Sequence, residues 1–410
     1  MNDTPRANRF HIIVLGRRNV GKSSLINSLA GQEVSIVSDV AGTTTDPVQK
    51  AMEILPLGPV VFIDTAGIDD TGDLGLLRVE KSFSVLDKAD MVLLVLNDAL
   101  AVGEYEKKVL SEASERNIPL VAVVNKIDEN VYSADILEAL GKKLPDVPVV
   151  SVSSLTGEGI DELKETMVVH AIKDLNDVPI VHDLLNKGDV VLLVTPIDSA
   201  APKGRMILPQ VQVIRDILDG DCSLVVTKED GLAQVLGNLQ SKPQMVITDS
   251  QVFGYVNSVV PPEIALTSFS ILFARYKGEL AILVDGAKAI DNLQPGDKVL
   301  MSEACTHHRQ EDDIGTVKIP NWLNKYVGGK LDFHWTAGND FAADLSQYKL
   351  IVHCGSCMIN RQQMLTRLLQ AKQAGVPIVN YGVAIAYMQG ILQRVLSPFP
   401  ELAKALKNGV

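Results

Sequence analysis

The segment from Gly16 to Ser23 has the residue types and the spacing of a phosphate-binding loop. It reads GRRNVGKS, which matches the pattern GxxxxGK[ST], and it directly follows a short apolar run. Glycines let consecutive backbone N–H groups converge on phosphate oxygens, and a helix that begins behind the loop adds its partial positive charge. The pattern predicts that Lys22 reaches the β- and γ-phosphates and that the Ser23 hydroxyl ligates magnesium. The residues of this loop that we expect to bind nucleotide are Asn19, Val20, Gly21, Lys22, Ser23 and Ser24.

A second cluster, Asp64-Thr65-Ala66-Gly67, follows the next apolar run and completes the phosphate side of a nucleotide site. At this position an acidic side chain can hold the water shell of magnesium, which is the role we expect for Asp64. The Gly67 backbone N–H is expected to donate to the γ-phosphate. Both residues would lie at the carboxyl end of a parallel strand, beside the phosphate loop.

A third cluster, Asn125-Lys126-Ile127-Asp128, has the chemistry to recognise a guanine base. A carboxylate at Asp128 can accept hydrogen bonds from both N1–H and N2–H of guanine, and adenine lacks that donor pair. The segment Ser153-Ser154-Leu155 would supply backbone donors for the guanine carbonyl oxygen. Since these clusters all follow predicted strands, they are expected to line one crevice. The sequence therefore predicts a domain that binds GTP or GDP with Mg²⁺ and hydrolyses GTP to GDP and phosphate.

Together these motifs resemble those of the translation-factor-related GTPases that include Era, EngA and the tRNA-modification GTPase MnmE. The segment Gly42–Asp46 reads GTTTD and resembles their switch I motif, which implies Thr44 as a second magnesium-ligating hydroxyl. Asn19 matches the asparagine that holds K⁺ in the cation-activated members, although a turn asparagine can also simply stabilise a loop. Ile68 stands where a water-orienting glutamine is usual. The residues expected to act in hydrolysis are Lys22, Thr44, Asp64 and Gly67.

Three of the four cysteines lie near the C-terminal end, in two groups that each contain histidine. The two groups, Cys305-Thr306-His307-His308 and His353-Cys354-Gly355-Ser356-Cys357, both follow predicted strands. Three thiols with a histidine suit structural zinc, whereas iron–sulfur clusters typically use four cysteines. A redox CxxC pair and unliganded core cysteines are further alternatives, and residue chemistry alone leaves zinc and iron–sulfur about equal. Cys222, remote in sequence, is expected to be a small buried side chain.

The order of a GTPase domain, a middle α/β domain and a C-terminal CxH…HCxxC site resembles the HydF family of FeFe-hydrogenase maturation GTPases over essentially the whole chain. The resemblance implies that Cys305, Cys354 and Cys357 bind a 4Fe–4S cluster. It also implies His307 as a weak fourth ligand. The rival fourth ligands are Glu303, His308 and His353.

The same resemblance implies a scaffold and carrier function. Such a protein would hold a diiron (2Fe) precursor, to which two radical-SAM maturases contribute, and would pass it to apo FeFe-hydrogenase. A homodimer through the middle domain is implied as well. Two alternatives stay open at this point: an Era-like RNA- or ribosome-associated GTPase, and a GTPase whose C-terminal site is structural zinc.

The elements that must position these residues alternate between apolar strands and amphipathic helices. Short β-branched runs of this kind are typical of parallel strands buried on both faces. We therefore predict an α/β fold with a P-loop GTPase domain followed by two smaller α/β domains with mainly parallel sheets. The predicted domains are residues 1–173 (GTP-binding), 178–262 (middle, dimerisation) and 263–410 (cluster-binding), with Pro261-Pro262 at the second boundary. The predicted strands are 11–16, 60–64, 91–97, 120–125, 147–153, 190–198, 223–227, 245–250, 298–305, 350–354 and 376–382.

Composition sets bounds on the function. The 410 residues are 46% hydrophobic and 21% charged, which is an ordinary globular profile. The formal net charge of −12 argues against general nucleic-acid binding, which needs a basic surface. No apolar run approaches the ~18 residues of a membrane span, and no signal peptide is apparent. With few cysteines, the chain is expected to be cytoplasmic, without a nucleic-acid or membrane partner.

Overall fold

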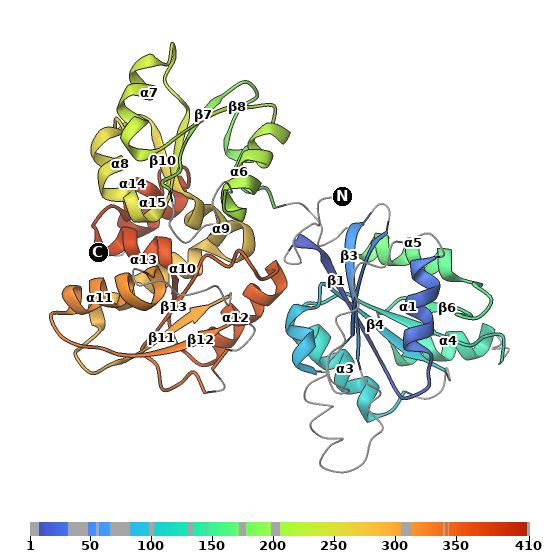
Figure 1. Cartoon of the computed structure of the whole chain (residues 1–410). Coiled ribbons are helices and arrows are strands. Elements are labelled where there is room, and N and C mark those ends of the chain that lie inside the picture. The colour runs from blue at the N-terminus through green and yellow to red at the C-terminus, as the bar shows by residue number, and fades with distance from the viewer. Residues whose placement is uncertain are drawn as a thin grey trace. The chain divides into compact units, whose positions relative to one another are not determined.

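The computed structural model describes residues 8–31, 48–54, 57–65, 83–97, 102–129, 134–144, 146–171, 178–197, 206–304, 313–338, 341–342 and 344–407. Contacts within the chain divide it into two compact units, Met1–Asp177 and Val178–Val410 (Figure 1). Both units are α/β, as the alternation of apolar runs and amphipathic segments predicts.

The first unit is built on a six-stranded sheet in the order β2-β3-β1-β4-β5-β6. All neighbouring strands are parallel except β2 and β3, which form an antiparallel pair. The central strands are apolar throughout, and all six residues of β4 are buried. The strands are β1 Phe10–Gly16, β2 Val48–Ile54, β3 Gly58–Asp64, β4 Met91–Leu96, β5 Leu120–Val124 and β6 Val149–Ser151.

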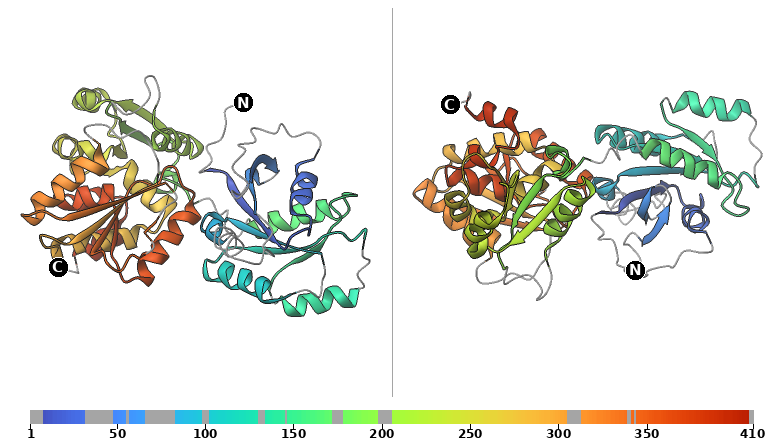
Figure 2. Two further views of the ribbon diagram at one scale, coloured as in Figure 1. Left: turned by 60° about the horizontal axis from the view of Figure 1, so that its bottom comes forward. Right: turned by 90° about the horizontal axis from the view of Figure 1, so that it is seen from above.

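Helices cover both faces of this sheet (Figure 2). Alternate residues of β1 point to opposite faces, so Ile12 joins one core cluster and Ile13 the other. The first cluster includes residues of α1 and α5, and the second includes residues of α3 and α4. The helices are α1 Lys22–Ala30, α3 Glu104–Glu115, α4 Ala134–Lys143 and α5 Ile160–Ala171. This three-layer arrangement places the strand ends, and the loops that follow them, at one edge of the sheet.

The second unit contains two four-stranded sheets, in the orders β10-β9-β7-β8 and β12-β11-β13-β14. Every strand pair in both sheets is parallel. The predicted fold class, a P-loop GTPase domain followed by α/β parts with mainly parallel sheets, is therefore confirmed. The strands are β7 Val190–Val194, β8 Ser223–Thr227, β9 Met245–Thr248, β10 Ala265–Ser268, β11 Lys298–Glu303, β12 Asp332–Ala337, β13 Leu350–His353 and β14 Ile378–Asn380.

One continuous hydrophobic core serves both sheets of this unit. It includes Leu192 of β7 and Ile351 of β13, both fully buried. The strand β10 follows Pro261-Pro262, yet it pairs with β9, so the first sheet of this unit continues beyond the proline pair. The division of the chain into three domains, with a boundary at these prolines, stays a prediction. The helices are α6 Leu208–Asp219, α7 Leu232–Asn238, α8 Phe253–Val259, α9 Phe269–Lys277, α10 Leu280–Ala287, α11 Ile319–Val327, α12 Arg361–Gln373, α13 Tyr381–Met388, α14 Leu392–Val395 and α15 Pro400–Lys407.

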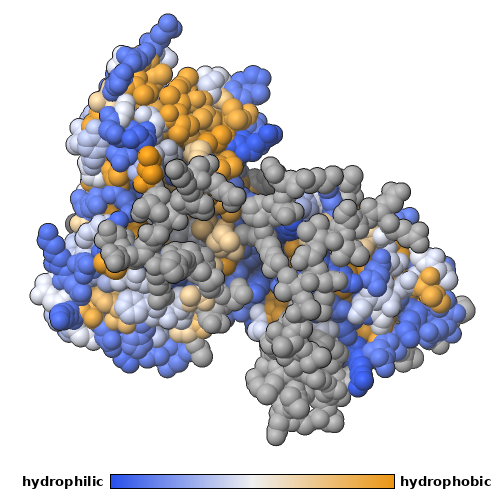
Figure 3. Space-filling view, viewed as in Figure 1, coloured by the Kyte–Doolittle hydropathy of each residue, from blue (hydrophilic) through white to orange (hydrophobic). Residues whose placement is uncertain are grey.

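The strand β8 forms one edge of its sheet and carries an apolar surface. Val226 on β8 is 42% exposed, and Val211 and Leu218 on α6 are also exposed. Figure 3 shows hydrophobic residues gathered over this part of the unit. An exposed apolar sheet edge offers unpaired backbone groups to another strand.

Within the described ranges, no helix combines the length and the apolar character that crossing a bilayer requires.

Candidate functional site

The phosphate loop joins the carboxyl end of β1 to the N-terminus of α1. Gly21 stands at the start of α1 in the left-handed conformation, with φ 93°, and a Cβ there would lie 2.3 Å from the Asn125 side-chain nitrogen. A Cβ on Gly16 would lie 2.4 Å from the Val95 carbonyl oxygen. The chain can pass this close to β4 and to the end of β5 only because both positions are glycine.

Lys22 lies inside the loop. It is only 8% exposed, and its Nζ donates to the carbonyl oxygens of Gly16 and Arg17, both at 2.9 Å. The ammonium group is thus held beside the N-terminus of α1, where the helix dipole also favours an anion. Asn19, also in this loop, is exposed and has a left-handed backbone with φ 62°.

Ser23 and Asp64, the two described residues predicted to bind magnesium, contact each other. The Ser23 hydroxyl, in the first turn of α1, donates to Asp64 Oδ2 at the end of β3, at 2.5 Å. Asp64 Oδ1 is buried and has no hydrogen-bond partner within the part of the chain that the structure describes. A hydroxyl and a carboxylate with a spare oxygen are hard donors that suit Mg²⁺. Two further predicted residues of this site, Thr44 and Gly67, lie outside the described residues.

Asn125 connects the phosphate side of the site to its base side. The side chain is 1% exposed, and its Nδ2 donates to the Val20 carbonyl oxygen at 2.9 Å. Its Oδ1 accepts hydrogen bonds from the Ser154 amide at 3.1 Å and from the Ser154 hydroxyl at 2.8 Å. One carboxamide therefore fixes the phosphate loop and the 153–155 segment relative to each other.

The base side contains the remaining predicted residues. Ser153 is buried, and its hydroxyl donates to Asp128 Oδ1 at 2.5 Å. Lys126 has a left-handed backbone, with φ 67°, at the turn between β5 and Asp128. Leu155 is 85% exposed. The structure thus brings the described residues of the predicted nucleotide set to one edge of the sheet.

An ion pair beside the phosphate loop was not predicted from the sequence. Arg17 donates two hydrogen bonds to Glu106 of α3, at 2.8 and 2.9 Å, and Glu106 is fully buried. The Gly103 amide also donates to Glu106, at 2.8 Å. Burial by itself would raise the pKa of Glu106, but the hydrogen bonds from Arg17 and Gly103 lower it below its ordinary value. The only feature of the sequence that could have pointed to a role for Glu106 is its position in the first turn of a predicted helix.

The two described C-terminal cysteines, Cys354 and Cys357, follow strand β13 of the second sheet. Cys354 follows β13, and the amide of Ala304, which follows β11, donates to its Sγ at 3.0 Å. Ala304 directly precedes Cys305, which lies outside the described residues together with His307 and His308. Cys354 and Cys357 are partly buried, free of any disulfide, and separated by a turn in which Ser356 has a left-handed backbone with φ 59°.

The cysteine pair has the chemistry of a soft-metal site. Burial raises the pKa of the Cys354 thiol, while the Ala304 amide and the charge of Arg367 act in the opposite direction. Burial and the neighbouring Cys354 raise the pKa of Cys357 to about 11. A raised pKa favours the thiol form, so a metal that binds here must displace the protons of both cysteines. These residues fit a thiolate-bound metal group, although within the described residues no three His, Cys, Asp or Glu side chains form a complete site.

His353 is committed to protein contacts. It is fully buried, its Nδ1 donates to the Cys354 carbonyl oxygen at 2.9 Å, and its Nε2 accepts from Arg367 at 2.8 Å. Burial and the charge of Arg367 lower the pKa of His353 to about 3, so the ring is neutral at physiological pH. Both ring nitrogens of His353 are therefore used within the protein in this arrangement. Glu303 is 3% exposed at the end of β11 and raises the pKa of Cys354, so it remains a rival.

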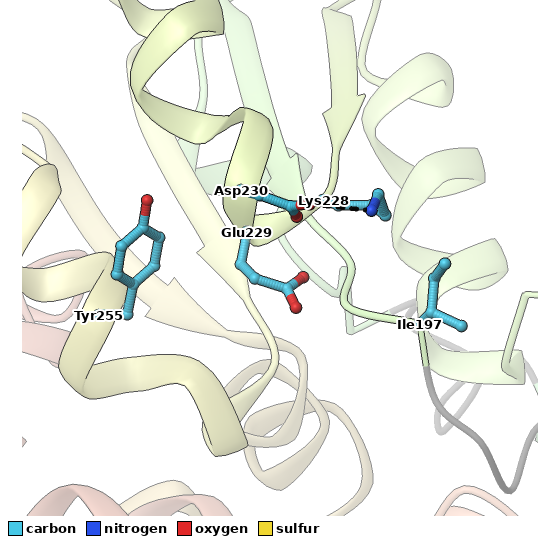
Figure 4. A pocket seen from close by; sticks show the side chains of 5 residues that line it. All are labelled: Ile197, Lys228, Glu229, Asp230 and Tyr255. Atoms are coloured by element: carbon cyan, nitrogen blue, oxygen red, sulfur yellow. Dashed lines mark hydrogen bonds and ion pairs between the residues drawn. The ribbon is translucent and has the colours of Figure 1, made fainter.

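A cavity and the fourth cysteine lie apart from the cysteine pair in the second unit. A cavity of about 430 Å³ lies at the carboxyl ends of β7 and β8. Figure 4 shows the side chains that line it. Lys228 and Asp230, which form an ion pair at 3.1 Å, are among its lining residues. Its lining residues, Ile197, Lys228, Glu229, Asp230 and Tyr255, include none of the predicted nucleotide or cluster ligands. The fourth cysteine, Cys222, is 5% exposed, as predicted for a small buried side chain.

Three family models match successive parts of this chain, one in the first unit and two in the second. The 50S ribosome-binding GTPase model matches residues 11–126. The hydrogen maturase F dimerization domain matches residues 180–278, and the hydrogen maturase F tetramerization domain matches residues 281–398.

Curated relatives match the first unit. The tRNA modification GTPase MnmE of Nitrosomonas europaea is 36% identical over 158 residues, which are 38% of this chain and 34% of the relative. The GTPase Der of Wolinella succinogenes is 39% identical over 164 residues, again 38% of this chain and 34% of the relative. The chain therefore spans about a third of the length of the curated relatives it matches. Among solved structures, the G domain of the T. maritima FeoB iron transporter is 26% identical, covering 40% of this chain and 99% of that one at a TM-score of 0.32.

The two hydrogen maturase F models together match more than half of the chain. They follow a P-loop GTPase domain whose described nucleotide-site residues lie together. The tetramerization-domain match includes β11 and β13, the strands that precede the cysteine segments. The chain belongs to the hydrogen maturase F (HydF) family.

Proposed function

We propose that this chain is a GTP-hydrolysing scaffold and carrier, which binds a 4Fe–4S cluster and a diiron precursor and delivers the precursor to apo FeFe-hydrogenase. The observation that carries the proposal is the hydrogen bond from the Ala304 amide to Cys354 Sγ, at 3.0 Å. This contact brings the strand end that leads directly into Cys305 against the sulfur of the CxxC segment. Cys305, Cys354 and Cys357 are then the three cluster ligands, with His307 as a weak, exchangeable fourth.

An incomplete set of thiolates suits a carrier. Three cysteines can hold three irons of a cubane, while the fourth iron keeps a weaker ligand that an incoming group can displace. Two radical-SAM maturases would contribute to the diiron precursor, which is cargo rather than a resident cofactor. The family-model matches support this role, since both descriptions name a hydrogen maturase.

GTP hydrolysis in this proposal is carried out at the first unit. Lys22, Ser23 and Asp64 would hold the phosphates and Mg²⁺, with Thr44 and Gly67 completing the site. Asn19 would hold K⁺ against the phosphates, so that the cation does electrostatic work that an arginine does in other GTPases. Because all of these residues precede residue 155, hydrolysis is expected to be separable from cluster binding by mutation.

A homodimer through the middle domain is part of the proposal. The dimerization-domain match covers the sheet that ends at β8, and β8 is an edge strand with Val226 exposed. Pairing two copies along this edge would satisfy backbone groups and cover the apolar surface. The cell compartment proposed is the cytoplasm, where reduced thiols are available for cluster assembly.

The experiment that tests the cluster site compares three full-length proteins after anaerobic reconstitution: wild type, Cys354→Ser and Cys222→Ser. Iron, sulfide and zinc are measured, an EPR spectrum is recorded after reduction, and GTP turnover is assayed on the same preparations. We expect iron and sulfide in wild type and in Cys222→Ser, loss of both in Cys354→Ser, and GTP turnover in all three. Only wild type and Cys222→Ser should then activate apo FeFe-hydrogenase.

Two outcomes would contradict the proposal. Full iron content in Cys354→Ser would remove that residue from the site. Zinc instead of iron in anaerobically purified wild type would show that the C-terminal site is structural zinc.

A further inference from the structure

A buried arginine stands behind the cysteine segment. Arg367 of α12 is 2% exposed, and it donates to His353 Nε2 at 2.8 Å and to the Gly338 carbonyl oxygen at 2.7 Å. Its guanidinium carbon lies 5.2 Å from the centre of the Phe341 ring, a cation–π distance. The Ser302 hydroxyl accepts a longer hydrogen bond from the same group, at 3.4 Å. These four contacts hold the positive charge of the guanidinium group in one position.

His353 carries the contact from Arg367 to the cysteine segment. With Nε2 accepting from Arg367, the ring proton is on Nδ1, which donates to the Cys354 carbonyl oxygen at 2.9 Å. The Ser356 hydroxyl lies 3.3 Å from the same ring nitrogen. The chain of contacts Arg367–His353–Cys354 therefore sets the direction in which the Cys354 backbone leaves β13.

The charge of Arg367 lies close to the cysteine segment. Its guanidinium is one hydrogen bond away from His353, the residue directly before Cys354, and Lys277 at the end of α9 is a second buried cation. A cluster held by three thiolates is anionic, and it gains a further negative charge when it is reduced by one electron. Nearby net charge and outer-shell hydrogen bonds are among the factors that set the reduction potential and the retention of such a group.

We infer that Arg367 is a positioning residue for the cluster, which fixes the Cys354 segment through His353 and raises the reduction potential of the bound cluster. This inference rests on the proposed cluster site. It assigns to a residue outside the ligand set the control of how firmly, and in which redox state, the cluster is held.

The test compares reconstituted full-length wild type with Arg367→Gln, Arg367→Lys and Arg361→Gln. Arg361 is a matched control, because it lies on the same helix and its guanidinium donates to the Tyr276 carbonyl oxygen at 2.6 Å, not to His353. The readouts are the midpoint potential from an EPR-monitored dithionite titration and the rate of iron loss to a chelator. Thermal unfolding of each protein reports folding.

Removing the charge in Arg367→Gln should shift the midpoint to a more negative potential and speed iron loss about ten-fold. Arg367→Lys should keep the midpoint close to that of wild type, because the charge is retained. It should still lose iron faster, because an ammonium lacks the planar fork of donors that contacts both His353 and Gly338. Arg361→Gln should match wild type in both readouts.

A wild-type midpoint and wild-type iron retention in Arg367→Gln would overturn the inference, as would an equal shift in Arg361→Gln. If Arg367→Gln does not fold, unchanged iron retention in Arg367→Lys overturns it. Failure of the wild type to take up iron is a different result: it refutes the cluster site of the proposed function, and with it the ground of this inference.

Discussion

The Ser153 hydroxyl donates a 2.5 Å hydrogen bond to Asp128 Oδ1 and accepts one from the Thr156 amide at 3.1 Å. Asp128 is exposed, yet its carboxylate is held in one direction by a buried neighbour. A recognition group that is oriented before the ligand arrives loses less conformational freedom on binding. The carboxylate is therefore prepared for the two N–H donors at the edge of guanine.

Asp128→Asn should lose GTP affinity, because the amide cannot accept both guanine donors. The lost contact is charge-assisted and bidentate, worth about 2–4 kcal/mol once water is excluded. Titration with a fluorescent GTP analogue measures the change, and Asp161→Asn on the exposed face of α5 is the control. Wild-type affinity in Asp128→Asn would show that another residue selects the base.

GTP hydrolysis should be faster in K⁺ than in Na⁺ at equal ionic strength. Asn19 lies exposed in the phosphate loop, where its amide oxygen could share a K⁺ with phosphate oxygens, and Na⁺ is too small to span the same donors. Phosphate release measured in the two salts checks this, together with the same pair of assays on Asn19→Ala. Equal turnover in both salts, or a K⁺ response that survives in Asn19→Ala, would contradict the role of Asn19.

Glu106→Gln should destabilise the region around α3 by about 1–3 kcal/mol, since it replaces a buried, paired carboxylate with a neutral amide. The pKa of Glu106 is lowered from its ordinary value of 4.5, so its contribution is present above about pH 4.5 and is lost as the pH falls through the lowered pKa. Hydrogen exchange of α3 peptides, corrected for intrinsic rates, should separate the variant from wild type at neutral pH and bring them together in acid.

The control for this prediction is Glu104→Gln, in the same turn of the helix. Glu104 pairs with Lys107 at 2.9 Å, but its side chain is 93% exposed, so the change should be small at every pH. Equal protection of α3 in Glu106→Gln and wild type at neutral pH would show that the Arg17–Glu106 pair does not stabilise this region.

Val226→Lys should convert the proposed dimer to a monomer. A lysine on the edge strand β8 adds a charge to the apolar surface and opposes strand pairing there. Light scattering coupled to size exclusion measures the mass, and Val169→Lys on α5, also at an exposed valine, is the control. An unchanged dimer mass in Val226→Lys would place the interface elsewhere.

The sequence predicted the buried strands far better than the edge strands. The central run Met91–Leu96 is apolar at every position, because both faces of β4 are covered, and such a run is visible without a structure. Of the edge strands, β6, β8 and β14 were predicted, whereas β2, β10 and β12 were missed. The missed sequences, VQKAMEI, ALTS and DFHWTA, mix polar and apolar residues.

The residues of the nucleotide site and of the cysteine site could be predicted where they directly follow an apolar strand. The nucleotide motifs and the cysteines stand at strand ends in the sequence, and the described ones lie at strand ends in the structure. The contacts that fix them could not be predicted. Arg17 and Glu106 are 89 residues apart, and Arg367 and His353 are 14 apart on different elements, so only the tertiary fold brings them together.

The single hydrophobic core of the second unit couples metal loading at the cysteine site to dimerisation at β8, although these lie on different sheets. Since Leu192 of β7 and Ile351 of β13 belong to one buried cluster, the two sheets should unfold in one cooperative transition. Anything that binds only the folded state then stabilises the whole unit by mass action. Loading the cysteine site would raise the thermal midpoint of the β8 edge as well, and dimerisation at that edge would protect the cysteine site from local opening, although the two share no side chain.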